Sequence, residues 1–150
     1  MEVNHGCDFR ELFRAIAVQT AMTVGDQPNH EMLLAQVRGP QKSTDPLWND
    51  ATISYFAVLD LVEGKGTQRG YFINAHVDGG NSWGTFEGAV VPVGGEVRCD
   101  GTWQHTGGTG NFAGVSGEGT FSMRMTSPKT VETSWKGVYE LAGAAAAGKG

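Results

Sequence analysis

Short glycine-rich turns recur roughly every 10–15 residues in the second half of the chain, and they constrain the fold more than any other feature. Stretches rich in β-branched and aromatic residues lie between these turns. Glycine supplies 23 of the 150 residues, about twice the usual share of ~7%. The chain has no G-X-Y period, and its 4 Trp, 7 Phe and 3 Tyr argue against a collagen-like or disordered polypeptide. The pattern predicts an all-β domain of strands joined by tight turns.

Alternation of side chains within the stretches predicts how the strands are used. From Thr130 to Leu141, one parity carries Trp135 and Tyr139, and the other is mainly polar. Eight strands are expected, at residues 15–24, 32–37, 51–62, 68–77, 82–91, 96–106, 120–126 and 130–141. Eight consecutive antiparallel strands most simply close into an up-and-down β-barrel, because closure leaves no unpaired edge. Such a barrel has room inside for side chains or one small ligand.

The two ends of the chain are harder to interpret. Apolar residues from Phe9 to Ile16 have the spacing of a helix, which Asp8 could cap, but residues 15–24 also suit a strand. We therefore expect a short N-terminal helix or extension that leads into the first strand. The sequence predicts one barrel domain over residues 1–141 and a low-complexity tail over residues 142–150.

Charge and composition exclude several functions. The chain has 11 Lys and Arg against 16 Asp and Glu, a net charge of −5, and no basic run that would favour nucleic acid. No long apolar run predicts a membrane span, and the N-terminus lacks the pattern of a signal peptide. Cys7 and Cys99 are far apart and suggest free thiols in a cytoplasmic protein. The four histidines have no metal-ligand spacing, so no metal and no cofactor are expected.

One segment of the chain is similar to a known family. The run Gly101–Phe121 contains Gly107-Gly108-Thr109-Gly110-Asn111-Phe112, and it resembles the glycine hairpin of the allene oxide cyclase-like barrels. Residues 82–88 are in keeping with small bacterial members of that superfamily, which also includes dirigent proteins and spirotetronate cyclases. The resemblance covers roughly residues 50–141. It implies an eight-stranded barrel with an apolar lumen, often oligomeric, that steers reactions of hydrophobic molecules without a cofactor.

Two polar residues on one expected strand are candidates for catalysis. Asn74 and His76 share a parity with Phe72, whereas the opposite parity of that strand is apolar. If the apolar parity faces the lumen, the polar residues are merely solvated; if it packs elsewhere, they line a pocket. Tyr55 lies on the preceding strand and is expected to face Asn74 or His76 across the ladder. In the pocket interpretation, His76 could transfer a proton near neutral pH.

Other residues suggest a ligand-binding wall. We expect Trp103, His105, Trp135, Tyr139 and Phe86 to line an aromatic lumen, to which Trp83 could also contribute. Ordinary core packing explains the same aromatic residues equally well, and a satisfied histidine in the core or at the rim is the commoner explanation of His105. Glu87 is expected on the outer face.

The leading functional prediction is a cofactor-independent isomerase or cyclase acting on a small hydrophobic molecule in the lumen. The alternative is a binding or carrier protein that uses the same pocket without chemistry, and the fold hosts both. Outward-facing Val58, Val62, Val90 and Val138 predict a homodimer or homotrimer, since a lone barrel rarely exposes so much apolar surface.

Overall fold

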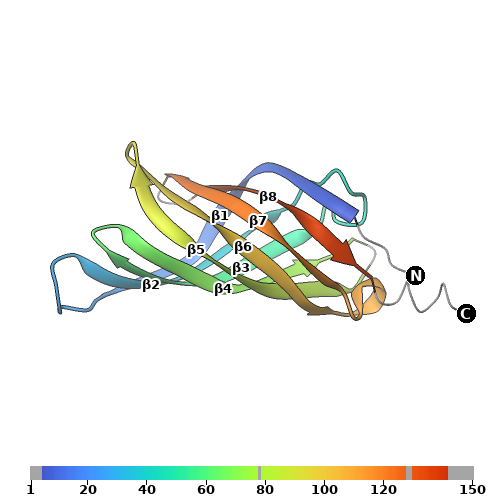
Figure 1. Ribbon diagram of the computed structural model, residues 1–150, viewed down its shortest axis with the longest axis horizontal. Coiled ribbons are helices and arrows are strands. Elements are labelled where there is room, and N and C mark those ends of the chain that lie inside the picture. The colour runs from blue at the N-terminus through green and yellow to red at the C-terminus, as the bar shows by residue number, and fades with distance from the viewer. Residues whose placement is uncertain (1–4, 78, 128–129, 142–150) are drawn as a thin grey trace, which may run out of the picture.

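The computed structural model describes residues 5–77, 79–127 and 130–141, with side chains from residue 20 onward except that of Thr126. The expected tail at 142–150 lies outside the described residues, as does Asp78. The prediction of an all-β domain with eight antiparallel strands is confirmed (Figure 1). The strands are β1 (His5–Thr23), β2 (His30–Pro40), β3 (Thr52–Val62), β4 (Lys65–Ala75), β5 (Asn81–Val93), β6 (Glu96–Gly108), β7 (Ser116–Ser127) and β8 (Thr130–Glu140), with one 3-10 turn, η1 (Gly110–Phe112).

Each strand pairs antiparallel with the next along the chain, and the order β1 to β8 forms a closed barrel. Closure depends on β1, which is shared between two neighbours. Its first half, from His5 to Ala15, pairs with β8, and its second half, from Ala15 to Thr23, pairs with β2. The long hairpins give the barrel an elongated shape, with the β1–β2, β3–β4 and β5–β6 turns at one end (Figure 1).

The expected N-terminal helix is wrong, because residues 5–23 form a single strand. The pairing register of β1 shifts between Phe9 and Leu12 and again between Ile16 and Val18. Each shift is a β-bulge or similar irregularity, which moves the following residues out of strict alternation. In the sequence, the apolar residues around these shifts have a mixed spacing of three and four, which imitates the periodicity of a helix.

The structure decides which parity of β4 faces inward. Phe72 is 5% exposed, and Asn74 and His76 are also buried, whereas Tyr71 is 65% exposed and Ile73 is exposed as well. The inward parity continues around the barrel. Its side chains form two core clusters, one around Trp103 and Trp135, which also includes Trp48 from the β2–β3 loop, and a smaller one around Val37, Val90, Cys99, Met123 and Val131.

Glycines make room for the largest of the inward side chains. A β-carbon on Gly137 would lie 2.3 Å from the indole ring of Trp103, and one on Gly119 would lie 2.6 Å from it. The indole therefore lies directly against the backbone of β7 and β8. There its Nε1 donates a hydrogen bond to the carbonyl oxygen of Thr120 at 3.2 Å. Any larger residue at either glycine would push the indole out of this position.

The outer face carries several exposed apolar side chains, including Leu34, Phe56, Val58 and Val138. Val90 does not belong among them, because its side chain is buried in the smaller core cluster. Trp83, a candidate for the lumen, instead lies on the exposed face of β5. No helix among the described residues is long and apolar enough to cross a membrane.

Candidate functional site

Two loops close one end of the barrel. The first is the loop between β2 and β3, residues 41–51, and the second is the connection between β6 and β7, which contains η1 (Figure 1). Each places one large aromatic residue in the interior, Trp48 from the first loop and Phe112 from η1, and both are 1% exposed. The end of the lumen is therefore sealed from solvent by the chain itself.

The indole of Trp48 occupies an aromatic chamber at this sealed end. Five rings surround it, with centroids 4.9–6.4 Å from that of the indole, and all five meet it edge-on or tilted. They belong to His76, His105, Phe112, Trp135 and Tyr139. We call this space the Trp48 chamber. The ring of His76 also stacks on that of Phe112, with centroids 3.6 Å apart.

A chain of buried hydrogen bonds runs along the wall of the Trp48 chamber. Nε1 of Trp135 donates to Oε1 of Gln41 at 3.1 Å, and Nε2 of Gln41 donates to Oδ1 of Asn74 at 3.3 Å. Nδ2 of Asn74 donates to Oγ of Ser82 at 3.2 Å, and that oxygen lies 2.8 Å from Nε2 of His76. The chain links β8, the first loop, β4 and β5, and it fixes the position of the His76 imidazole.

His105 is the exception to this hydrogen bonding. Its side chain is 3% exposed, and neither ring nitrogen has a hydrogen-bond partner among the described residues. Burial, with a smaller contribution from the charge of His76, lowers the pKa of His105 from 6.5 to about 3. The imidazole is therefore neutral at physiological pH, with one donor and one acceptor nitrogen unused. Buried polar groups without partners are rare in folded proteins.

Deeper in the barrel lies an internal cavity of about 40 Å³. It is lined mainly by apolar and aromatic side chains, those of Ile53, Tyr55, Phe72, Phe86, Trp103, Phe121, Met123 and Trp135, together with Gln68 and Thr133. The amide Nε2 of Gln68 lies 4.0 Å from the sulfur of Met123, a weak acceptor. The buried hydroxyl of Thr133 has no partner among the described residues. The cavity has room for water, but it is far smaller than the ~300–1,000 Å³ of a typical ligand pocket.

The residues expected at the site fall into two groups. Asn74, His76, His105, Trp135 and Tyr139 lie around the Trp48 chamber, and Trp135 also borders the cavity. Tyr55, Phe86 and Trp103 line the cavity. The expectation that Tyr55 faces Asn74 or His76 is wrong. In the register of β3 and β4, Tyr55 is opposite Phe72, and Ile53 is opposite Asn74. Tyr55 is therefore two residues further along β3 than the residue that lies opposite Asn74.

Sequence analysis missed several residues of the Trp48 chamber. Gln41 and Trp48 lie in a polar, proline-containing loop, where no periodicity indicates burial. Ser82 follows a turn and resembles an ordinary strand-flanking residue. The available signal was the apolar pair Leu47-Trp48 within that polar loop, since such a pair is unusual in a solvated segment.

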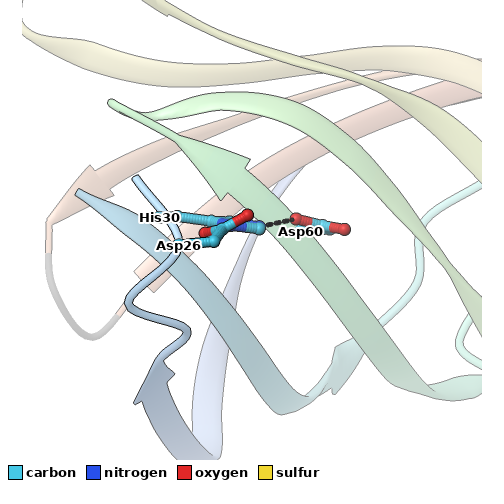
Figure 2. Close-up of polar contacts among 3 residues, drawn as sticks. All are labelled: Asp26, His30 and Asp60. Atoms are coloured by element: carbon cyan, nitrogen blue, oxygen red, sulfur yellow. Dashed lines mark hydrogen bonds and ion pairs between the residues drawn. The ribbon is translucent and has the colours of Figure 1, made fainter. Parts of the chain in front are cut away.

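A separate polar cluster lies beside the β1–β2 turn (Figure 2), at the end of the barrel opposite the two loops (Figure 1). His30, at the start of β2, is between two carboxylates: its Nδ1 is 2.5 Å from Oδ1 of Asp26, and its Nε2 is 2.6 Å from Oδ1 of Asp60. Hydrogen bonds, first to Asp26 and then to Asp60, raise the pKa of His30 above 6.5. The cluster joins the β1–β2 turn to β3. Among the described residues, no group of three or more His, Cys, Asp and Glu side chains is arranged to hold a metal ion.

Comparison with known proteins gives one line of evidence. No protein-family model matches the chain, and no curated protein is similar to it in sequence. Among solved structures, it is similar to that of the pterocarpan synthase dirigent protein GePTS1. The TM-score is 0.54 at 10% identity, over 93% of this chain and 89% of that one. The likeness supports an all-β, barrel-like fold similar to that of this dirigent protein.

Proposed function

We propose that this protein binds and orients a small, mainly apolar molecule at the sealed end of its lumen, without a cofactor. The observation that carries the proposal is His105, a buried neutral imidazole whose two nitrogens have no partner among the described residues. It lies in an aromatic chamber that excludes water, where one hydrogen bond to a ligand is worth more than in solvent. An apolar enclosure with a few convergent polar groups is the usual form of a small-molecule site.

The dirigent-like neighbour supports the same proposal from the fold. A barrel of this type offers a lumen in which a flexible molecule can be held in one conformation while water is excluded. Because identity to that neighbour is only 10%, its substrate is not transferred to this chain. The proposal therefore names a class of molecule, small and hydrophobic.

We further propose that the bound molecule is isomerised or cyclised, with His76 as the group that transfers a proton. The buried chain from Gln41 through Asn74 and Ser82 holds its imidazole in one orientation, as an acid–base group requires. Asn74 would orient the substrate from the chamber wall, and Tyr55 from the cavity side. In the alternative, a carrier without chemistry, the same groups only hold the ligand.

Changing His76 to Ala separates these two functions once a substrate is found. A proton-transfer role predicts that turnover falls by roughly 10²–10⁴-fold while binding changes little. A carrier role predicts weaker binding and no turnover in either protein. Retention of full turnover by His76→Ala would contradict the proposed acid–base role.

Binding in the lumen is tested with neighbouring residues that point to opposite sides of β4. Phe72 lines the interior and Tyr71 is on the outer face, so Phe72→Ala and Tyr71→Ala form a matched pair. The probe is N-phenyl-1-naphthylamine, a neutral molecule whose fluorescence rises in apolar surroundings. We expect Phe72→Ala to change its affinity by roughly tenfold, from the loss of aromatic contact or the gain of space, and Tyr71→Ala to leave it unchanged. The reverse result would place the probe on the outer face and refute binding in the lumen.

Self-association in a dimer or trimer remains part of the proposal. The exposed apolar side chains of Leu34, Phe56, Tyr71 and Val138 on the outer face support it. Light scattering across a range of protein concentrations tests it, and a 15.9 kDa particle at every concentration would contradict it.

A further inference from the structure

We propose that the Trp48 chamber is the ring-binding part of the ligand site. Residues 41–51 form a removable plug in it, and a ligand binds by displacing Trp48 from the chamber. The inference rests on the proposed function and adds the place and the chemical class of the ligand. That class is a flat, uncharged molecule about the size of an indole, with one group able to hydrogen-bond to His105.

The shape of the Trp48 chamber defines this class. The indole is enclosed by five aromatic or imidazole rings whose faces and edges suit another flat ring. His105, which lines the chamber, is held neutral by burial, so an ionised ligand would be desolvated there without a counter-charge. The present cavity of about 40 Å³ is too small for such a ring. A ring-bearing ligand in the lumen must therefore take space that a side chain now occupies. Trp48 and Phe112 both come from loops, and Trp48 is the ring that the other five enclose.

Trp48 fills the Trp48 chamber without satisfying its polar groups. Its own Nε1 is buried and has no hydrogen-bond partner among the described residues, and the same is true of both nitrogens of His105. Indole nitrogen is a donor only, and the geometry places it where it meets no acceptor. A ligand that donates to or accepts from His105 would gain an interaction that Trp48 lacks. This difference favours exchange of one ring for the other, because unmade buried hydrogen bonds are costly.

The segment 41–51 is built to move as one piece. Its two ends are joined, since the backbone N–H of Gln41 donates to the carbonyl oxygen of Ala51 at 2.8 Å and that of Asp50 donates to Gln41 at 2.8 Å. Its interior has its own hydrogen bonds, including that of the Trp48 N–H to the Asp45 carbonyl oxygen at 3.0 Å. These bonds survive a rotation of the loop about its joined ends, so opening exposes the chamber without unfolding the loop.

A hydrogen bond from the barrel wall latches the loop. The hydroxyl of Tyr139 on β8 donates to Oδ2 of Asp45 at 2.7 Å. Removing that hydroxyl weakens the closed state and leaves the aromatic wall in place. If closure competes with the ligand, apparent affinity rises as the open fraction grows, so the variant should bind more tightly. If Tyr139 merely supports the fold, its loss should leave binding unchanged or weaken it.

The experiment measures binding of 5-fluoroindole by ¹⁹F NMR titration to the full chain and its variants. We expect Tyr139→Phe to bind the probe roughly three- to tenfold more tightly than the unmodified protein, as the loss of one hydrogen bond to a carboxylate implies. Tyr71→Phe is the matched control, since it removes a hydroxyl from an exposed tyrosine, and it should bind like the unmodified protein. Equal or weaker binding by Tyr139→Phe would overturn the plug.

A second variant tests the Trp48 chamber itself. Trp48→Ala empties it, and millimolar indole should then raise the thermal midpoint by at least about 2 °C, whereas Trp83→Ala on the exposed face of β5 should show no rise. If Trp48→Ala fails to fold, the comparison of Tyr139→Phe with Tyr71→Phe decides alone. Binding by Trp48→Ala and by no other form would overturn the proposed displacement.

The outcomes separate this inference from the proposed function. If the unmodified protein binds 5-fluoroindole and Tyr139→Phe binds it no more tightly, the plug is wrong, and the Phe72→Ala and Tyr71→Ala pair still decides whether the lumen binds a ligand. If neither the unmodified protein nor any variant binds 5-fluoroindole, the plug is overturned, and the proposed function falls with it only if N-phenyl-1-naphthylamine also fails to bind in the lumen.

Discussion

Acidification should destabilise this protein through His105 more than through an ordinary histidine. Burial, and to a smaller extent the charge of His76, lower the pKa of His105 to about 3 in the folded state, against 6.5 when unfolded. Between these two values the unfolded chain binds a proton that the folded chain refuses, so stability falls as pH falls. At about 1.4 kcal/mol per pH unit, the loss is about 4–5 kcal/mol over the whole window and about 3 kcal/mol between pH 7 and pH 4.

Urea unfolding at pH 7 and pH 4 measures this effect when the protein is compared with its His105→Phe variant. Phenylalanine keeps a ring in the same place and cannot be protonated. Carboxylates and the other histidines titrate in both proteins, so their effects cancel in the difference. We expect the unmodified protein to lose about 3 kcal/mol more than the variant between the two pH values. Above pH 7, His105 should not contribute to the pH dependence of stability, so the difference in stability between the two proteins should stay constant.

Parallel loss of stability in the two proteins would refute the reasoning. It would mean that His105 accepts a proton in the folded state, which requires water or a partner beside the ring. The Trp48 chamber would then be wet, and the argument for an unsatisfied, ligand-seeking imidazole would fail with it.

Three further predictions follow from the same structure. The hydrogen bonds of Asp26 and Asp60 raise the pKa of His30, so the stabilisation that they give the folded protein is present below pH 6.5 and is lost as pH rises through the raised folded pKa. Between pH 6 and pH 9 the urea midpoint of the unmodified protein should therefore fall through this group, and that part of the fall should be absent in His30→Gln. Burial raises the pKa of the Cys99 thiol to about 12, so the folded protein should not react with a disulfide reagent at pH 8 when the other cysteine is replaced by serine. Reaction at the rate of a free thiol would contradict this burial. Gly137→Ala should lower the free energy of unfolding by about 1–3 kcal/mol or more, because the added carbon would lie 2.3 Å from a buried indole, and unchanged stability in urea would contradict that contact.

Strand periodicity predicted the outline of the fold well. Turn spacing placed the strands from Ala51 to Leu141 close to their observed positions, because local turn chemistry and alternation determine them. The N-terminal segment was misread as a helix, because register shifts in β1 break the alternation on which the prediction depends. A pairing irregularity is set by two partner strands and is not visible in one of them.

The site was harder to predict than the fold. Alternation grouped Asn74 with His76 but left open which parity faces inward, since the outer face of β4 is also apolar through Tyr71 and Ile73. Only the closed barrel decides that question. Trp48 could not be placed from the sequence, because burial of a loop residue depends on contacts with strands far away in the chain. The side chain that fills the site was therefore the one that no local pattern indicates.

A crystal structure of the unmodified protein with 5-fluoroindole tests the central claim most directly. The proposal of ligand binding at the sealed end predicts the probe's ring beside His76 and Phe112, its nitrogen within hydrogen-bond distance of His105, and Trp48 withdrawn from the Trp48 chamber. A probe found only on the outer face, with the Trp48 indole still enclosed by its five rings, would contradict it.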